Sequence, residues 1–329
     1  MRALQEVSQK FWDDWKAVRQ YMQKHPHIIQ RSRGSELKSI DQTSMDSFLC
    51  DDFLWGWLNV NTRCIYYQLN ISPTNPDNLT MCPILDFANH TSTSKHMSPV
   101  TPNPRSWPMP SMKKAGDLTF LAPRDVLQEG EEIYLCYGAH ANRTLFVEYG
   151  FINELLEPTA VLDEFNGEVD VQDIIERLFE DRGTLGTWMK SVLEDNGYWG
   201  DWTLHSSPSP AHPSYRLITA LRLYHTTFEA ASGTNIREEA LKPWQDTLLG
   251  IRTMVSEENE TAWRKSLIQI CETLTTRAKV GLSKLVTRPT SFDDASWLAW
   301  MQDNIKSLWR EEALVAAAVS DSVRKGTQF

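Results

Sequence analysis

The sequence has no long apolar run and no cluster of basic residues. Its apolar stretches are far shorter than the ~20 residues that a membrane-spanning helix needs, so we expect no transmembrane segment and no membrane partner. Residues Met1–Glu6 contain no apolar segment of signal-peptide type, which argues against secretion. The 33 basic residues are scattered among 43 acidic ones, so we expect no direct binding of nucleic acid.

Paired cysteine motifs are also absent. No two cysteines have C-x-x-C or C-x-C spacing, no histidine stands at zinc-finger spacing, and the cysteines are Cys50, Cys64, Cys82, Cys136 and Cys271. We therefore predict no structural zinc site and no other metal centre. An odd number of scattered cysteines indicates a reducing compartment, so we expect a cytoplasmic or nuclear location.

Acidic charge is concentrated in the second half of the chain. The formal net charge is −10; residues 1–150 hold 15 basic and 16 acidic residues, whereas residues 151–329 hold 18 and 27. The simplest interpretation is a solvated acidic helix face. The alternative is that the acidic half attracts a basic protein partner by long-range electrostatics.

Helical periodicity dominates both ends of the chain. Apolar residues recur at helical steps from Leu4 to Met22, and this helix is expected to end before Pro26. A second helix, over residues 44–63, has apolar residues on nearly every side, which predicts burial on most sides. Short apolar runs separated by turn residues follow and predict strands. Amphipathic helices then continue to the end, the last with an apolar face of Trp297, Trp300, Met301, Ile305 and Leu308.

Two stretches carry candidate chemistry. The first is Pro83–His90, an apolar run that ends in Asn-His. The second begins at Glu129, forms a predicted strand ending in Tyr137-Gly138, and continues to Tyr149-Gly150-Phe151. Taken separately, Asn-His is most often a turn and Tyr-Gly most often the edge of a hairpin. Their combined order and spacing are much more specific.

In this order and spacing the two stretches resemble the C-terminal half of a SET domain. Upstream, Trp55–Arg63 is similar to the last insert helix in the branch of the Rubisco large-subunit lysine methyltransferase. The resemblance implies an α+β fold: a partial SET domain of short β-strands with a helical insert, followed by an all-α substrate-binding bundle. The expected regions are the insert at residues 1–66, the C-terminal SET region at 67–152 and the substrate-binding domain at 153–329.

The resemblance implies a protein-lysine N-methyltransferase that uses S-adenosyl-L-methionine and acts on a non-histone protein. Such a methyl transfer needs a neutral amine aligned with the sulfonium of the cofactor. By resemblance, Tyr137 is the catalytic candidate, since its hydroxyl can orient the amine. Tyr149 and Phe151 line the lysine channel, where aromatic walls exclude water and favour a methylammonium product.

The cofactor-binding residues implied by the resemblance are Arg63, Asn89 and His90. The side-chain amide of Asn89 would hold the ammonium or the carboxylate of the cofactor, and the backbone of His90 would bond the adenine. Arg63 would contact the cofactor carboxylate, although an ordinary surface salt bridge explains this arginine equally well.

One element of the family is absent, because the sequence contains no Gly-x-Gly of the kind that cradles the methionine end of the cofactor. We therefore expect the N-terminal half of the SET domain to be missing and cofactor binding to be weak. Two alternatives stay open. One is a non-catalytic protein-binding scaffold derived from a SET methyltransferase, and the other is a protein-histidine methyltransferase.

Overall fold

The computed structural model describes residues 2–28, 42–66, 78–99, 119–153, 167–228, 234–286 and 295–329. The chain divides into two compact units, which we call unit 1 (residues 1–153) and unit 2 (residues 154–329). Residues 67–77, where the predicted C-terminal SET region begins, lie outside the described residues. Helices and short strands occur together, so the predicted α+β class is confirmed.

Two helices of unit 1, α1 (Arg2–Lys24) and α3 (Gln42–Arg63), pack through aromatic side chains. Phe11 is buried in α1, and its ring centroid lies 5.7 Å from Phe53 and 5.6 Å from Trp57 of α3. As predicted, α1 ends just before Pro26. The predicted burial of α3 on most sides is wrong, because apolar residues of its other face, such as Trp55 at 72% exposure, lie open.

Short strands and one short helix make up the rest of the described part of unit 1. Strands β1 and β2 pair antiparallel, and β3 is the central strand of a second sheet, antiparallel to β4 and parallel to β5. Their bounds, with those of the 3-10 helix η3 and the helix α4, are β1 Cys64–Tyr66, β2 Leu79–Met81, η3 Leu85–Phe87, β3 His96–Pro99, β4 Phe120–Leu121, β5 Tyr134–Leu135 and α4 Asn142–Tyr149.

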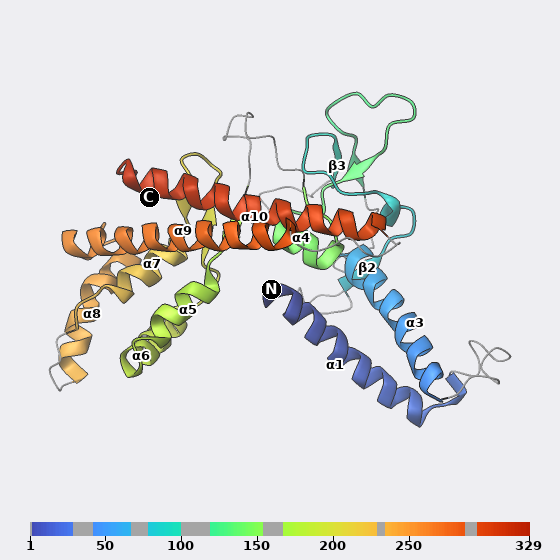
Figure 1. Cartoon of the computed structure of the whole chain (residues 1–329), viewed down its shortest axis with the longest axis horizontal. Helices are drawn as coiled ribbons and strands as arrows, with labels where there is room; N and C mark the ends of the chain where they lie inside the picture. Colours follow the sequence, from blue (N-terminus) through green and yellow to red (C-terminus); the bar gives the residue numbers. More distant parts are fainter. Residues whose placement is uncertain are drawn as a thin grey trace. The chain divides into compact units, whose positions relative to one another are not determined.

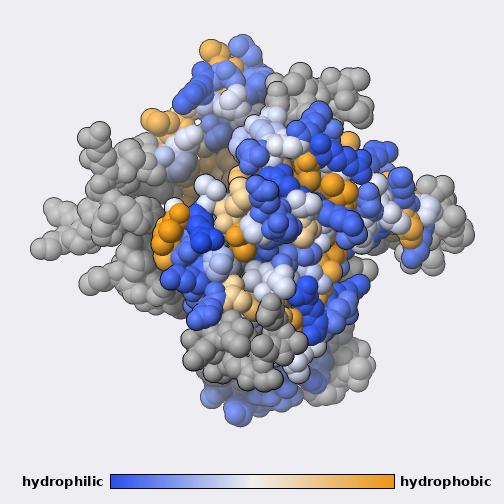
Figure 2. Space-filling model, turned by 90° about the vertical axis from the view of Figure 1, so that its left-hand side faces the viewer, coloured by the Kyte–Doolittle hydropathy of each residue, from blue (hydrophilic) through white to orange (hydrophobic). Residues whose placement is uncertain are grey.

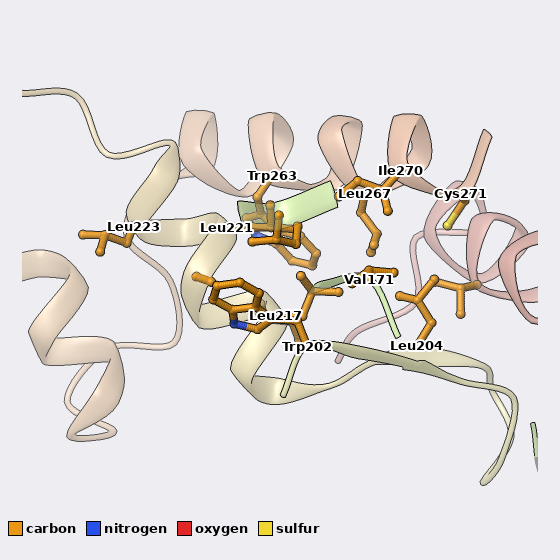
Figure 3. Close-up of a cluster of buried hydrophobic side chains, with 14 of the residues drawn as sticks. Val171, Trp202, Leu204, Leu217, Leu221, Leu223, Trp263, Leu267, Ile270 and Cys271 are labelled. Carbon is orange, nitrogen blue, oxygen red and sulfur yellow. The ribbon is translucent and has the colours of Figure 1, made fainter. Parts of the chain in front are cut away.

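Unit 2 is built mainly from helices around its own apolar core. The longest two helices, α9 and α10, run side by side (Figure 1). Figure 3 shows the core near Trp202, Leu217 and Trp263, all of which are fully or almost fully buried. The bounds of the helices are α5 Gln172–Glu180, α6 Thr184–Asp195, α7 Tyr215–Tyr224, α8 Thr234–Leu248, α9 Glu257–Val286 and α10 Ala295–Arg324.

Unit 2 differs from the predicted all-α bundle in one respect. Strands β6 (Glu168–Asp170), β7 (Thr203–His205) and β8 (His212–Pro213) form a three-stranded antiparallel sheet. Val169 and Leu204 are register partners that point into the core. Strands of two or three residues are too short to show alternation, which explains why the sequence pattern did not predict them.

The apolar face predicted for the last helix is only partly correct. Trp297 and Trp300 lie at 62% and 49% exposure, near the start of α10. The buried apolar side chains of α10 come from its C-terminal half, and they are Val315, Ala316, Val319 and Val323. Small residues recur at helical spacing there, where α10 packs against α9.

Two glycines permit close approach of neighbouring elements in unit 2. A Cβ atom on Gly186 of α6 would lie 1.7 Å from the carbonyl oxygen of Phe179 in α5. A Cβ atom on Gly281 of α9 would lie 2.3 Å from the indole ring of Trp309 in α10.

The face of the molecule drawn in Figure 2 is mainly hydrophilic, with separate hydrophobic patches. Among the described residues, no helix is long and apolar enough to cross a membrane.

Candidate active site

A backbone bridge brings the two motif stretches together in unit 1. The amide of Leu135 donates to the carbonyl of Asn89 at 2.8 Å, and the amide of Thr91 donates to the carbonyl of Leu135 at 2.9 Å. His90 is thus the parallel bridge partner of Leu135. In a parallel pair with this pattern, the intervening residue directs its own amide and carbonyl to the opposite side. The peptide groups of His90 therefore face away from β5.

The hydroxyl of Tyr137 is held against the Asn-His turn. It donates a hydrogen bond of 2.9 Å to the carbonyl oxygen of Ala88, immediately before Asn89. Burial raises the pKa of Tyr137, the positive charge of Arg63 opposes this shift, and Glu132 adds to it. The phenol therefore stays protonated at neutral pH. Because the hydroxyl donates its hydrogen to the carbonyl oxygen of Ala88, the lone pairs of the hydroxyl oxygen can accept a hydrogen bond from an N–H group.

Two aromatic rings lie close to the ring of Tyr137. Its ring centroid lies 5.2 Å from Tyr149 and 6.3 Å from Phe151, and the centroids of Tyr149 and Phe151 are 6.0 Å apart. Gly150 caps α4 with a φ of 85° and turns the chain so that the two rings can converge. All three side chains are partly buried, so the structure brings the three predicted substrate-site residues into one cluster.

The predicted cofactor-binding residues lie next to this cluster. The side-chain amide of Asn89 donates to Oε1 of Glu132 at 2.5 Å, which leaves the amide oxygen as an acceptor. Arg63, at the end of α3, donates from Nη1 to the carbonyl oxygen of Asp86 at 2.7 Å. Arg63 therefore contacts the backbone of η3, three residues before Asn89, and its remaining guanidinium donors can hold an anion.

Sequence reasoning assigned no role to Glu132, Asn142 and Asn153. Glu132 orients the Asn89 amide, and Asn153 and Asn142 extend the hydrogen bonds of His90. A signal for Glu132 was its place at the start of the predicted strand that ends in Tyr137. Asn142 is the first residue of α4 and lies within the second motif stretch, and Asn153 follows the helix; nothing in the sequence indicates their contacts.

Comparison with curated proteins shows the class to which this site is similar, the SET-domain protein-lysine methyltransferases. The chain is 34% identical over 172 residues to the ribosomal lysine N-methyltransferase set11 of Schizosaccharomyces pombe, a match that covers 52% of this chain and 35% of the relative. It is 25% identical over 293 residues to SET domain-containing protein 4 of Homo sapiens, covering 88% and 58%. These relatives confirm the resemblance predicted from the motifs.

A third relative is ribosomal lysine N-methyltransferase 2 of Saccharomyces cerevisiae, at 29% identity over 222 residues, covering 66% of this chain and 42% of the relative. The chain thus spans between about a third and three-fifths of the length of these relatives. No family model matches. A crystal structure described as the SET domain of LSMT bound to lysine and AdoHcy aligns with a TM-score of 0.43 and 16% identity, over 98% of this chain and 63% of that one.

Proposed function

We propose that this chain forms part of an S-adenosylmethionine-dependent protein-lysine N-methyltransferase that acts on a non-histone protein. One observation carries the proposal: the Tyr137 hydroxyl donates to Ala88 beside Asn89, while its ring meets Tyr149 and Phe151. An aromatic channel and an oriented hydrogen-bond acceptor are thereby joined to the turn expected to hold the cofactor.

The chemistry of Tyr137 follows from its hydrogen bond. Because the hydroxyl proton is committed to Ala88, the oxygen accepts from an N–H of the substrate amine and so fixes the direction of the nitrogen lone pair. Because burial raises the pKa of Tyr137, we assign the hydroxyl no role as general base, and the proton of the lysine ammonium leaves to water. Tyr149 and Phe151 exclude water from the side chain and stabilise the methylammonium product by cation–π contact.

The donor and acceptor set of the neighbouring residues fits S-adenosylmethionine. The free oxygen of the Asn89 amide and the carboxylate of Glu132 suit the ammonium of the cofactor, and the guanidinium of Arg63 suits its carboxylate. The peptide groups of His90, which face away from β5, suit the edge of the adenine. When bound, the cofactor supplies the methyl group.

The names of two relatives suggest which substrates to test first, because both are called ribosomal lysine N-methyltransferases. Ribosomal proteins are basic, and residues 151–329 of this chain hold 27 acidic against 18 basic residues. Charge complementarity therefore favours a basic protein substrate.

The test has two steps, both with the whole 329-residue chain. Calorimetry measures the binding of S-adenosylmethionine to the parent and to Asn89→Ala. Loss of a hydrogen bond to a charged group costs about 1.5–3 kcal/mol, so we expect the variant to bind roughly 10- to 150-fold more weakly. Radiolabelled methyl transfer is then measured on purified ribosomal proteins, with histones as control substrates, and the modified residue is identified by mass spectrometry.

Each outcome separates the candidate functions. Label on lysine of a ribosomal protein, lost in Tyr137→Phe, supports the proposal. Label on histidine would replace it by a protein-histidine methyltransferase. No binding of S-adenosylmethionine at millimolar concentration would refute an enzymatic role for this chain and would favour the alternative of a non-catalytic protein-binding scaffold. Equal affinity of the parent and Asn89→Ala would remove Asn89 from the cofactor site.

A further inference from the structure

The imidazole of His90 is bonded at both nitrogens. The backbone amide of Tyr137 donates to Nδ1 at 3.1 Å, and Nε2 lies 3.1 Å from Oδ1 of Asn153. A backbone amide only donates, so Nδ1 has no proton. An amide oxygen only accepts, so Nε2 carries the proton. The two contacts together select a single neutral tautomer.

Asn153 is itself fixed by a second hydrogen bond. Its backbone amide donates at 2.8 Å to Oδ1 of Asn142, which is buried at the first position of α4. The chain leaves α4 through Gly150 and returns to the start of the helix at Asn153. This bond joins the two ends of the segment 142–153, which carries Tyr149 and Phe151. The side chain of Asn153 then connects that segment to His90.

The His90 ring contacts two rings of the aromatic cluster. Its centroid lies 5.2 Å from Tyr137 and 5.5 Å from Phe151. If Nδ1 were protonated, its N–H would face the amide N–H of Tyr137, and two donors would oppose each other. The tautomer of His90 therefore affects where the backbone of Tyr137 lies.

The surroundings favour the neutral ring. Burial lowers the pKa of His90, the hydrogen bond to Asn153 opposes this shift, and electrostatic interaction with His140 and His96 lowers the pKa further. The other charged groups of this site, Arg63 and Glu132, act on the neighbouring Tyr137.

We propose that Asn153 is a positioning residue: together with the Tyr137 amide it holds the His90 ring in the Nε2–H tautomer, and it thereby fixes Tyr137 relative to Phe151. This inference deepens the proposed function and rests on it only for the role of Tyr137. The positioning itself follows from the chain of bonds from Asn142 through Asn153 and His90 to Tyr137.

The test compares two substitutions of similar size, Asn153→Leu and Asn153→Asp, in the whole chain labelled with ¹⁵N-histidine. The ring nitrogen shifts report the tautomer and the titration of His90, whose signal is assigned by its loss in His90→Gln. His225, whose Nε2 lies 2.8 Å from the hydroxyl of Ser266, is the internal reference signal from unit 2, which the substitutions do not touch.

The two variants should change His90 in opposite directions. The parent should show only the Nε2–H tautomer. Asn153→Leu removes the acceptor, so the Nε2–H group loses its partner, the ring is held by the Tyr137 amide alone, and the pKa of His90 should fall. Asn153→Asp keeps the acceptor and adds a negative charge, so the tautomer should persist and the pKa should rise by about 1 unit or more.

A second readout follows the amide proton of Tyr137. Its hydrogen exchange should be faster in Asn153→Leu at every pH. In Asn153→Asp it should become faster only below the new midpoint of His90, where Nδ1 gains a proton. A parent ring in the Nδ1–H tautomer, or an Asn153→Leu variant with the parental His90 pKa and parental exchange at Tyr137, would overturn the proposal.

These readouts need neither methyl donor nor substrate. A chain that shows the expected tautomers and exchange but transfers no methyl group refutes the proposed function alone. Where transfer is measurable, Asn153→Asp should lose kcat on the acidic side at a pH about 1 unit higher than the parent does. A parental pH profile in a variant with a raised His90 pKa would contradict the role of His90 in placing Tyr137.

Discussion

Replacing Gly186 by alanine should separate the effect of close packing from that of helix propensity. The new Cβ would lie 1.7 Å from the carbonyl oxygen of Phe179 and 2.7 Å from its carbonyl carbon. Both atoms belong to the backbone of α5, so no change of rotamer can relieve the overlap. Helix α6 must therefore move away from α5, which opens the core around Phe179 and Met189.

The expected magnitude is the difference between two terms. Alanine is favoured over glycine in a helix by about 1 kcal/mol. Overpacking typically costs about 1–3 kcal/mol, and an overlap this deep belongs at the upper end. The net loss in the free energy of unfolding should be about 2 kcal/mol. Gly56 of α3 is the matched control, since no atom lies within 4 Å of its added Cβ, so Gly56→Ala should gain about 1 kcal/mol.

The assay is guanidinium unfolding of the whole chain, followed by circular dichroism and tryptophan fluorescence. Each variant is compared with the parent transition of its own unit, because Gly56 lies in unit 1 and Gly186 in unit 2. A Gly186→Ala protein as stable as the parent would refute the close approach of α5 and α6. Equal losses in both variants would show that the glycines matter for a reason other than packing.

Three further predictions concern the site and the core of unit 2. Tyr137→Phe should raise the barrier of methyl transfer by about 2–4 kcal/mol, as for the loss of one preorganised polar group, with cofactor affinity unchanged in calorimetry. Burial raises the pKa of Cys271 to about 12, so at pH 8 a thiol reagent should modify exposed Cys136 long before Cys271 in time-resolved mass spectrometry. Arg277 bridges α5 and α10, so Arg277→Met should lower the free energy of unfolding by about 1–3 kcal/mol. Arg324 forms an exposed ion pair, so Arg324→Met should lower it by less than about 1 kcal/mol in the same chemical unfolding assay.

Each of these predictions has a contrary result. Parental turnover in Tyr137→Phe would show that the hydroxyl does not orient the amine. Equal labelling rates for Cys136 and Cys271 in the native chain would show that the core of unit 2 opens readily. Equal losses for Arg277→Met and Arg324→Met would show that the bidentate pair of Arg277 with Glu312 contributes no more than a surface ion pair.

The sequence predicted the helices best where the apolar stripe was also the packing face. In α9, one of the predicted amphipathic helices, the apolar residues at helical spacing are buried: Trp263, Leu267, Ile270, Leu274 and Ala278. In α10 the large side chains of Trp297 and Trp300 drew the prediction to the wrong half, since hydrophobicity alone does not tell which part of a long helix has a neighbour. The buried side chains of the other half, such as Val315 and Ala316, belong to the core of unit 2.

The candidate site was predictable in its parts and not in its connections. Asn89 and Tyr137 belong to motifs that are visible in the sequence, and the structure brings the Asn-His turn and strand β5 together. The orientation of Asn89 by Glu132 and of His90 by Asn153 depends on side chains that meet only after folding. Periodicity reports the faces of helices and strands, and it carries no information about such pairs.

The contact of Gly281 with Trp309 also restricts the paths by which this protein can evolve. Any side chain at position 281 would meet the indole ring at 2.3 Å, so a hydrogen atom is all that the parental partner tolerates. A smaller residue at position 309 must come first, and only then does alanine or serine at 281 become acceptable. The two positions should therefore vary together among descendants of this sequence, with the order of substitution fixed by the geometry of one helix pair.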